Sequence, residues 1–557
     1  MKKTAIFIIA TLGVTLTLGA RQSLPQSLQK LMNAQYAISN LYVDSVDENK
    51  LVEDAIVGML DKLDPHSSYT DAKETKEMEE PLQGEFSGIG IQFNMKQDTL
   101  YVIQTTPGGP SERVGILPGD RIIYVNDTTI AGVKIKNSDI QKKLRGKKGT
   151  KVTVKVKRGN QKDLITFKIT RDKIPLYSVD ASYMLDERTG YIRISNFGIK
   201  THDEMMDALN KLKKQGMTQV IIDLNDNGGG YLNSAIEMCN EFLNGGQLIV
   251  YTEGLNSPRN EATAFGNGKY KDLKMVVMVN QYSASASEIF AGAMQDWDRA
   301  VVVGRRTFAK GLVQRPIRFD DGSMMRLTVA RYYTPSGRCI QKPYVKGDKK
   351  AYNDDILNRS KEGEYYCIDS IQFNDSLRYS TLKNRRTIYG GGGIMPDIFV
   401  PLDTAEYSTY YRDLVAKGVI YQYAIDYVDK NRKDIKKQYA TVDDFDKRFN
   451  VTEDMMQALI AAGEKEKVTF NEEQYNTSKR VLRTYLKALI ARDTFAEQEA
   501  YTKIINHENP DLKAALEVIY DDTLFNSLLL NGNPEYDAIA ARHRQVQLEK
   551  QESKDNP

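Results

Sequence analysis

Residues 274–304 read KMVVMVNQYSASASEIFAGAMQDWDRAVVVG, and they predict a strand, a turn, a helix and a second strand. The two ends of the stretch are apolar and rich in valine, as buried strands are. Strands that alternate with helices form a largely parallel sheet with helices packed on it. The turn before the helix holds Ser283, Ser285 and Ser287. The stretch that defines an α/β core therefore also carries hydroxyl groups where one strand ends.

Ser285 and Lys310 form the most informative pair of residues in the chain. Lys310 follows the second strand of that stretch, within VVVGRRTFAKGLVQ (residues 301–314). A serine nucleophile needs a base, usually histidine, but no histidine lies in the Gly/Ser-rich centre of the chain. The four histidines are His66, His202, His507 and His543. A lysine can act as the base once burial favours its neutral form, and Ser-Lys pairs are an established variant of this chemistry.

A purely structural interpretation of the same residues stays open. Ser285-Ala286-Ser287-Glu288 is also a capping box, in which a serine and a glutamate three residues later start a helix. Lys310 is then an ordinary loop cation. The two interpretations are compatible, because a nucleophile at a helix start lies beside the positive end of the helix dipole, where developing negative charge is stabilised.

Length and composition predict a globular protein of several domains. The chain has 557 residues, of which 41% are apolar and 27% are charged. Its net charge of +3 is small for this length, so we expect no nucleic-acid partner. The three cysteines, Cys239, Cys339 and Cys367, are not spaced as metal ligands, and a Cys339–Cys367 disulfide stays open. We expect no metal and no cofactor.

The N-terminus has the pattern of a secretory signal peptide. Residues 1–22 read MKKTAIFIIATLGVTLTLGARQ, in which two lysines precede an apolar stretch that ends in small residues. The stretch is short for a membrane span, and no later segment is apolar enough to cross a bilayer. We predict a signal peptide over residues 1–20 and an exported protein, periplasmic if the cell has an outer membrane.

Two regions of different character follow. Residues 21–83 are predicted to be helical up to a break at Asp64-Pro65-His66-Ser67-Ser68-Tyr69, where the lone His66 is interpreted as structural. Residues 84–172 show short alternating strands. In them, FSGIGI (86–91) and TTPGGPSERVGILPGDRIIYVND (105–127) occur in the order of a PDZ domain, which this region resembles. PDZ domains add a peptide as an extra strand and hold its terminal carboxylate on loop amides. The resemblance implies a loop suited to an apolar last residue and made of Ser87, Gly88, Ile89, Gly90 and Ile91.

Residues 173–402 alternate strands and helices, which predicts an α/β core with a partly parallel sheet. The turn NDNGGGY (225–231) follows a predicted strand, and its glycines would let backbone N–H groups face an anion. A phosphate-binding loop is the rival interpretation, but no Gly-Lys-Ser/Thr follows and no G-x-G-x-x-G is present. Residues 403–557 carry no chemical motif. Helices are predicted there near residues 414–428, 453–462, 478–490 and 512–528, with a frayed end over 542–557.

Together these features resemble the carboxy-terminal processing proteases, also called tail-specific proteases. The strongest matches are VNQYSASASEIFAGAMQDWDRAVVVG (279–304), TFAKGLVQ (307–314), RYYTPSGRCIQ (331–341) and GGGGIMPDIFVP (390–401). The resemblance implies that Ser285 is the nucleophile, that Lys310 is its base and that Gln314 orients the lysine. Ser283 and Ser287 would then be structural, and Ser287 is the competing candidate for the nucleophile.

The chain departs from the family pattern in three places. Ala309 precedes the lysine where glycine is usual, and Cys339 stands where serine is common. Asn225 replaces an arginine at the glycine turn, which puts in doubt any role for an arginine there. None of the three departures removes a proposed catalytic group.

The predicted fold is multidomain, of α/β and β class. It consists of a signal peptide (1–20), an N-terminal helical region (21–83), a PDZ domain (84–172), a Ser/Lys protease core (173–402) and a helical C-terminal region (403–557). The predicted oxyanion hole comprises backbone N–H groups of Gly229, Gly230 and Ala286.

The predicted function is that of an exported serine endopeptidase whose PDZ domain selects protein or peptide substrates by apolar C-termini. Arg145 is a candidate link between the PDZ domain and the core. Two alternatives stay open: a non-catalytic PDZ-containing binding protein or chaperone, and a noncovalent ligand-binding protein with a related core. A homo-oligomer or an adaptor protein is left open as a partner.

Overall fold

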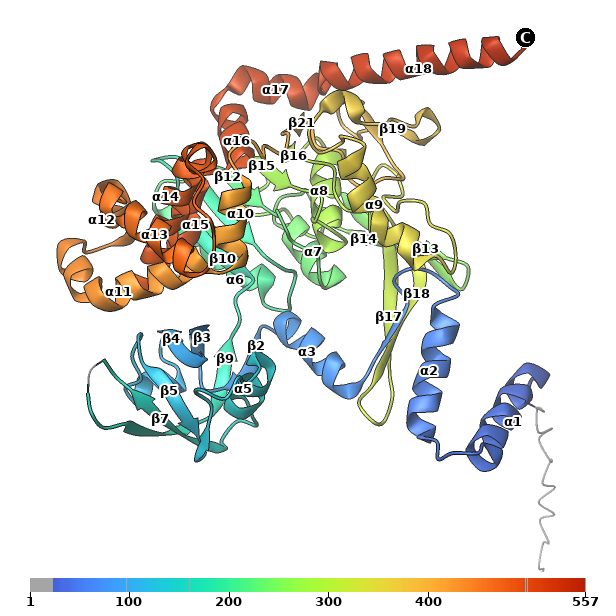
Figure 1. Cartoon of the computed structure of the whole chain (residues 1–557). Coiled ribbons are helices and arrows are strands. Elements are labelled where there is room, and N and C mark those ends of the chain that lie inside the picture. The colour runs from blue at the N-terminus through green and yellow to red at the C-terminus, as the bar shows by residue number, and fades with distance from the viewer. Residues whose placement is uncertain (1–23, 97, 160, 496, 498, 556–557) are drawn as a thin grey trace, which may run out of the picture.

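The computed structural model describes residues 24–555, except residues 97, 160, 496 and 498 (Figure 1). The predicted signal peptide lies outside these described residues. The described part has the predicted architecture: N-terminal helices, a small antiparallel domain where the PDZ domain was predicted, an α/β core with a mixed sheet and a helical C-terminal region. Within it, no helix combines the length and apolarity that a membrane span needs.

The N-terminal region comprises α1 (Gln26–Leu41), α2 (Glu48–Leu60) and α3 (Ala72–Gln83). Figure 1 shows α1 at the outer end of this region, on the far side of α2 from the core. The predicted break leads into β1 (Ser68–Thr70), which pairs antiparallel with β18 (Met324–Tyr333). The break is therefore the point at which the N-terminal region joins the core.

The PDZ domain is built around the antiparallel sheet β3-β4-β5-β7-β8, with β6 paired to β5. In β7, whose sequence is KVTVKVK, the three valines are buried while the residues between them are not, which is the two-residue period of a half-buried strand. β3 is the edge strand, as strand addition by a peptide requires. The bounds are β2 (Glu85–Gly88), β3 (Ile91–Lys96), β4 (Thr99–Thr105), α4 (Pro110–Arg113), β5 (Arg121–Val125), β6 (Thr128–Thr129), α5 (Asn137–Leu144), β7 (Lys151–Lys157), β8 (Ile165–Thr170) and β9 (Asp172–Pro175).

The core contains the six-stranded sheet β10-β11-β12-β15-β16-β21, which is parallel except for β10. Every residue of β12 is buried, as expected for a parallel strand covered on both faces. Residues of α6, α7 and α8 share one hydrophobic cluster with this sheet. The bounds are β10 (Val179–Met184), β11 (Thr189–Ile194), α6 (Thr201–Lys214), β12 (Gln219–Asp223), α7 (Leu232–Asn240), β15 (Lys274–Val279), α8 (Ala286–Asp296), β16 (Val301–Gly304) and β21 (Ile398–Phe399).

A second sheet, absent from the sequence-based expectation, joins β1, β18, β13 and β14 in that order, with β17 paired to β18. Its long β17–β18 hairpin extends away from the main sheet, next to α3 (Figure 1). The remaining elements connect the core to its last strand. The bounds are β13 (Leu248–Gly254), β14 (Ser257–Thr263), β17 (Leu312–Arg318), α9 (Lys349–Lys361), β19 (Arg378–Ser380) and β20 (Thr387–Tyr389).

The C-terminal region is helical, but two of its predicted helices are wrong in that each is broken. The helix expected over 414–428 is interrupted at Gly418, whose φ is +67°. The helix expected over 512–528 is interrupted at Asp521, whose carboxylate caps the next helix. The bounds are α10 (Thr409–Ala416), α11 (Val419–Gln438), α12 (Val442–Arg448), α13 (Glu453–Lys465), α14 (Glu472–Thr494), α15 (Ala500–Ile505), α16 (Pro510–Tyr520), α17 (Asp522–Asn531) and α18 (Pro534–Asp555).

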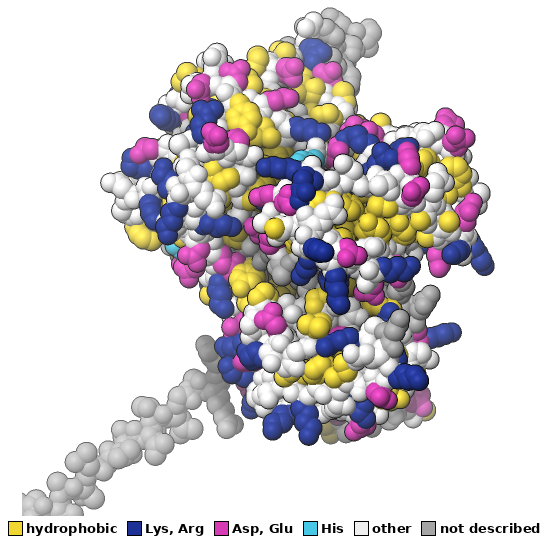
Figure 2. Space-filling model, turned by 90° about the vertical axis from the view of Figure 1, so that its left-hand side faces the viewer, with side chains coloured by type: hydrophobic (Ala, Val, Ile, Leu, Met, Phe, Trp, Pro, Cys, Tyr) yellow, Lys and Arg dark blue, Asp and Glu magenta, His cyan; other side chains and the backbone are white. Residues whose placement is uncertain are grey.

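The C-terminal region is packed against both other parts of the molecule. Apolar residues of α16 and α17 form a hydrophobic cluster with the face of the main sheet opposite α6–α8. Ile425 of α11 packs against Tyr101 and Ile103 of the PDZ strand β4. Gln104 extends this contact by donating hydrogen bonds to the carbonyl oxygens of Arg492 and Phe495, at 2.6 and 2.7 Å. Figure 2 views the molecule from this side and shows side chains of both charges spread over the surface.

A buried ion pair ties α16 to the core. Asp511 receives two hydrogen bonds of 2.9 Å from the guanidinium of Arg305, and it receives one of 3.0 Å from the Asn225 amide. All three side chains are buried. Asn225 stands where the resemblance implies an arginine. Arg305, which follows β16, contacts the same carboxylate as Asn225.

Candidate active site

Ser285 occupies a strained turn at the start of α8. Its φ of +57° and ψ of −111° are uncommon for a residue with a side chain. Such strain persists only where the surrounding structure enforces it, and it is concentrated at functional sites. The side chain is nearly buried, with 8% of its residue surface exposed. The strand–turn–helix order predicted for this segment is correct, from β15 to α8.

The glycine turn packs directly against Ser285. A Cβ atom added to Gly229 would lie 2.8 Å from Ser285 Cβ and 2.9 Å from the Ala286 backbone nitrogen. Gly229 also has a φ of +96°, and a Cβ on Gly230 would lie 2.2 Å from the Phe197 carbonyl oxygen. Both positions therefore require glycine, and the turn brings all three predicted oxyanion residues together.

The three predicted oxyanion donors differ in availability. The Gly229 N–H group donates to Asn227 Oδ1 at 2.9 Å. Among the hydrogen bonds of the described residues, none is donated by the N–H groups of Gly230 or Ala286. The Ala286 amide also lies in the first turn of α8, where N–H groups have no partner within the helix.

Lys310 lies in a loop that the Glu288 carboxylate holds beside Ser285. Glu288 is fully buried and accepts hydrogen bonds from the backbone N–H groups of Ser285 and Lys310, both at 2.8 Å. It accepts two more from Ala309 N–H at 2.7 Å and from Thr307 Oγ1 at 2.6 Å. One carboxylate therefore fixes the backbone of both predicted catalytic residues. The capping-box pattern in the sequence predicted that Glu288 contacts Ser285, but gave no sign that it contacts the loop of Lys310.

Ala309 accounts for part of the loop's shape. Its φ is +74°, in the left-handed region that favours glycine, and glycine is what the family usually has there. The Ala309 carbonyl oxygen accepts a hydrogen bond from the Lys342 N–H group. On the other side of Lys310, the Gly311 N–H group donates to Gln341 Oε1 at 2.8 Å. The loop is thus held on both sides of Lys310 although its conformation is costly for alanine.

Lys310 has the environment that a lysine base needs. Burial lowers its pKa below the usual value, and the nearby positive charge of Arg326 lowers it further. Glu288 and Asp64 act in the opposite direction more weakly. The neutral amine is therefore favoured relative to a lysine in water.

Ser285 and Lys310 line the same cavity, which has a volume of about 940 Å³. Its walls come from α3, the glycine turn, α7 and the β17–β18 hairpin. Among the hydrogen bonds of the described residues, none joins Ser285 to Lys310. Tyr332 lines the same cavity, and burial raises its pKa to about 12, a rise that the nearby Ser285 hydroxyl opposes.

Gln314 lines the cavity but does not contact Lys310 through a hydrogen bond among the described residues. Its amide donates to Thr328 Oγ1 at 3.2 Å, and Thr328 donates to Asp64 Oδ1 at 2.8 Å. Asp64 belongs to the N-terminal break and also accepts from the His66 N–H group at 2.9 Å. The proposed lysine-orienting residue is therefore held from the N-terminal region.

His66 lies behind the site and is held in its neutral form. Burial, and next the positive charge of Lys310, lower its pKa to about 3. Its ring is hydrogen-bonded to the Tyr352 hydroxyl at 2.9 Å. These contacts agree with a structural role for His66.

The predicted peptide-binding loop is connected to α3, which forms a wall of the cavity. Arg145 follows α5, lies over the Phe86 ring at 4.5 Å from its centre and forms an ion pair with Glu80 of α3. A Cβ added to Gly88, in the predicted loop, would lie 3.7 Å from Arg145 Cγ. Arg145 thus bridges the loop that would receive a carboxylate and a helix of the cavity wall.

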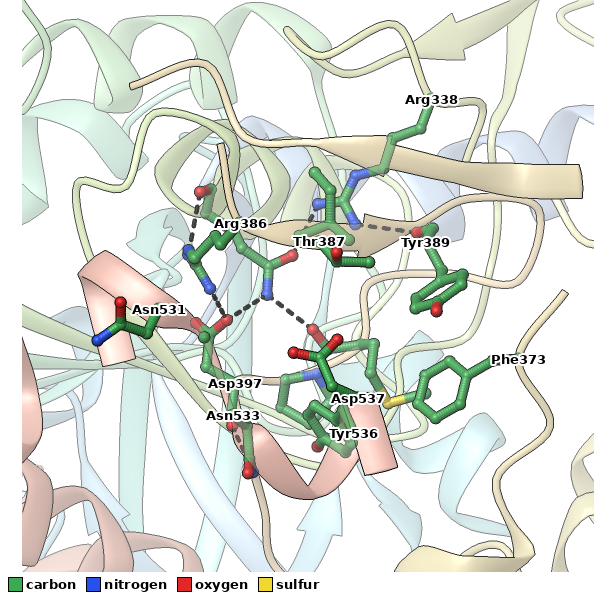
Figure 3. A pocket seen from close by; sticks show the side chains of 15 residues that line it. Arg338, Phe373, Arg386, Thr387, Tyr389, Asp397, Asn531, Asn533, Tyr536 and Asp537 are labelled. Atoms are coloured by element: carbon green, nitrogen blue, oxygen red, sulfur yellow. Dashed lines mark hydrogen bonds and ion pairs between the residues drawn. The ribbon is translucent and has the colours of Figure 1, made fainter. Parts of the chain in front are cut away.

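A second pocket, drawn in Figure 3, lies away from these residues and has room for about one water molecule, at about 30 Å³. Its arginines are already paired: Arg386 binds Asp298 and Asp397, and Arg338 binds Asp296 at 2.7 Å. The pocket is a buried ion-pair cluster, not a ligand site. The described residues contain no cluster of side chains suited to a metal ion, and all three cysteines are free.

Comparison with known proteins shows which family the chain belongs to. Peptidase family S41 matches residues 188–351, a PDZ domain matches 87–169, and the N-terminal domain of the activating protease CtpB matches 14–75. A family of unknown function matches residues 410–496. A probable CtpA-like serine protease of Staphylococcus saprophyticus is 35% identical over 348 residues, which cover 62% of this chain and 70% of the relative. The chain belongs to peptidase family S41, and its relatives include CtpA-like serine proteases.

Other relatives match a similar share of the chain. A probable CtpA-like serine protease of Staphylococcus aureus strain N315 is 36% identical over 324 residues, 58% of this chain. The match covers 64% of that relative, which is less than two thirds of its length. The solved structure of a photosystem II D1 C-terminal processing protease is 27% identical, with a TM-score of 0.33, and covers 57% of this chain and 91% of that chain.

Proposed function

We propose that this protein is an exported serine endopeptidase that uses Ser285 and Lys310 to cleave proteins selected by their C-terminal tails. The observation that carries the proposal is that a strained serine and a lysine with a lowered pKa line one cavity and share one buried carboxylate, Glu288. Export is inferred from the signal-peptide pattern of residues 1–22.

In the proposed mechanism, the neutral Lys310 amine takes the proton of Ser285 Oγ while this oxygen attacks a peptide carbonyl carbon. The tetrahedral oxyanion is bound by backbone N–H groups, with Ala286 and Gly230 better placed to donate than Gly229, which already has an acceptor. Collapse of the intermediate expels the amine, to which Lys310 returns the proton. Water then hydrolyses the acyl-enzyme, again with Lys310 as the base.

A non-catalytic binding protein is the alternative function. It has the PDZ domain in its favour, because peptide capture alone needs no nucleophile. The buried lysine argues against it, since burying a cation costs free energy that a mere binding protein need not expend.

The proposed function is tested by incubating the mature protein with two unfolded substrates that differ only at the C-terminus, one ending in alanine and one in aspartate. Faster loss of the first substrate, abolished by Ser285→Ala, is the expected result. Absence of cleavage of both by the intact protein would favour the binding-protein alternative. Equal cleavage of the two would contradict selection by an apolar tail.

Arg145→Ala is predicted to weaken activation by substrate tails about tenfold, within the usual range of coupling between two sites. A carboxylate bound at residues 87–91 would compete with Glu80 for Arg145. It would therefore weaken the ion pair that ties α3 to the PDZ domain. The measurement is the rate of cleavage of a tail-less substrate with and without an added peptide ending in an apolar residue. Lys147→Ala, an exposed cation two residues away, is the matched control. If the added peptide stimulates cleavage by Arg145→Ala as strongly as by wild type, this role of Arg145 is wrong.

We also propose that α1 joins a second copy of this chain. Among its residues none is buried, although it carries six large apolar side chains that are each at least 40% exposed: Leu28, Leu31, Met32, Tyr36, Ile38 and Leu41. Leu31→Glu is predicted to convert a dimer to a monomer in sedimentation equilibrium. Lys30→Glu, which adds a negative charge at the neighbouring exposed position, should leave the mass unchanged. A wild-type monomer at micromolar concentration would exclude this role for α1.

A further inference from the structure

Arg326 places a second cation in the cavity that holds Ser285 and Lys310. It lies on β18, opposite Pro316 of β17 on one side and Ser68 of β1 on the other. Its side chain lines the cavity together with Met324 and Tyr332 of the same strand. The spacing of two residues between Met324 and Arg326 puts them on the same face of the strand.

Arg326 has no acidic partner among the described residues. Its one hydrogen bond there is from Nη2 to Ser68 Oγ at 3.3 Å, and its buried Nε atom has no acceptor. Burial lowers its pKa without an opposing carboxylate. A half-buried guanidinium with an unused donor is costly, because such a group normally donates to a carboxylate, a carbonyl oxygen or water.

Other buried arginines of the core show how such a group is normally satisfied. Arg305, Arg338 and Arg386 each pair with an aspartate. Arg299 has no acid partner but donates to three carbonyl oxygens, at 2.7 to 2.9 Å. Arg338 also has an Nε without an acceptor, but its Nη2 is paired with Asp296. Among the described residues Arg326 differs from all four, because its guanidinium has neither a carboxylate nor a carbonyl oxygen as partner and lines the cavity that holds Ser285.

The acidic residues that line the cavity do not fill this role. Glu79 of α3 pairs with Arg318, farther along the β17–β18 hairpin. Glu237 of α7 is exposed and forms no ion pair among the described residues. An anion that satisfies Arg326 therefore has to come with a ligand that enters the cavity.

We propose that Arg326 is a substrate-binding residue that receives a carboxylate of the bound polypeptide, either the side chain of a glutamate or aspartate near the scissile bond or the terminal carboxylate. The proposal rests on the proposed peptidase function and names what this cavity selects. Arginine suits this role because its planar guanidinium donates two parallel hydrogen bonds to one carboxylate. The selection acts at the cavity and is separate from recognition of the tail by the PDZ domain.

The experiment uses the intact protein and fluorogenic peptides of one length. One series carries a single glutamate moved through successive positions, and a matched series carries glutamine instead. A third pair differs only in a free or an amidated C-terminus. For each pair, kcat/KM is measured for wild type, Arg326→Met and Arg315→Met at one pH. Arg315 lies on the adjacent strand, is exposed and does not line the cavity.

Wild type and Arg315→Met are expected to cleave the charged member of one pair about tenfold faster or more, because a charge-assisted hydrogen bond provides such a difference. Arg326→Met is expected to lose this preference. A preference within the glutamate series assigns a side chain, and one within the terminal pair assigns the chain end. Because kcat/KM is compared within a pair, any effect of the variant on the pKa of Lys310 changes both members equally and cancels. A ratio unchanged by Arg326→Met for every pair would overturn the proposal.

Binding to the Ser285→Ala variant separates this proposal from the proposed function. The favoured glutamate peptide should bind Ser285→Ala at least tenfold more tightly than its glutamine match, and Ser285→Ala/Arg326→Met should bind both alike. Failure of wild type to cleave any peptide, with this binding preference intact, would reject the peptidase and retain the carboxylate site. Cleavage without any charge preference would reject the carboxylate site and retain the peptidase.

Discussion

Ser285→Ala is expected to lower peptide hydrolysis about 10⁴- to 10⁶-fold, the range found when a serine nucleophile is removed from a peptidase. In the proposed mechanism the Ser285 hydroxyl oxygen forms the acyl bond, which the alanine variant cannot form. The strained backbone is kept, since alanine has the same Cβ constraints, and the melting temperature should change little. The measurement is hydrolysis of an unfolded substrate, with circular dichroism as the check on folding.

Ser287→Ala is the matched control for this prediction, because Ser287 is the competing nucleophile. Its Oγ already donates to the Asn227 carbonyl oxygen at 2.8 Å, and the residue is fully buried. We expect Ser287→Ala to lose about 1 kcal/mol of stability from the broken hydrogen bond and to retain cleavage. Full activity in Ser285→Ala together with loss in Ser287→Ala would reverse the assignment.

Lys310→Met is expected to lower hydrolysis at least about 10²- to 10⁴-fold, the usual contribution of a general base, and to raise the stability of the fold. The two effects have one cause. Burial lowers the Lys310 pKa because the folded protein disfavours the charged amine, and methionine carries no charge in that place. A variant that loses activity while its melting temperature rises is therefore expected. A matched loss of activity and stability would indicate a structural lysine.

The pH dependence of activity and of stability follows from the lowered pKa of Lys310. Activity requires the neutral amine, so kcat/KM should rise with pH through a pKa below the usual lysine value of about 10.4. Between the lowered pKa and the usual value, the unfolded chain binds more protons than the folded one, so the free energy of unfolding rises with pH there. Below that window the penalty for burying the charged amine is fully present. Lys310→Met should remove this part of the pH dependence, and an unchanged slope would contradict the assignment.

The sequence allowed prediction of what depends on local pattern. Alternating apolar runs and helices define the core sheet around residues 274–304, and the serine turn and the lysine loop carry recognisable motifs. The β17–β18 hairpin was missed because its strands are poor in apolar alternation: β17 reads LVQRPIR and contains Pro316, which suits only an edge strand.

The contacts that complete the site could not be predicted, because they join residues far apart in the chain. Asp64 reaches Gln314 only through Thr328, and Ser68 reaches Arg326 only because β1 pairs with β18. The reach of Glu288 to the lysine loop likewise depends on how β16 places that loop beside α8. Nothing in the spacing of these residues along the chain signals such proximity.

The contact of Asp511 with Arg305 and Asn225 also sets an order of events during synthesis. Ribosomes make the nucleophile and the glycine turn long before they make α16, so a growing chain holds Arg305 and the turn without their anionic partner. The exposed sheet face beneath α16 is likewise uncovered until then. We therefore expect the core to complete its packing only after α16 has been made.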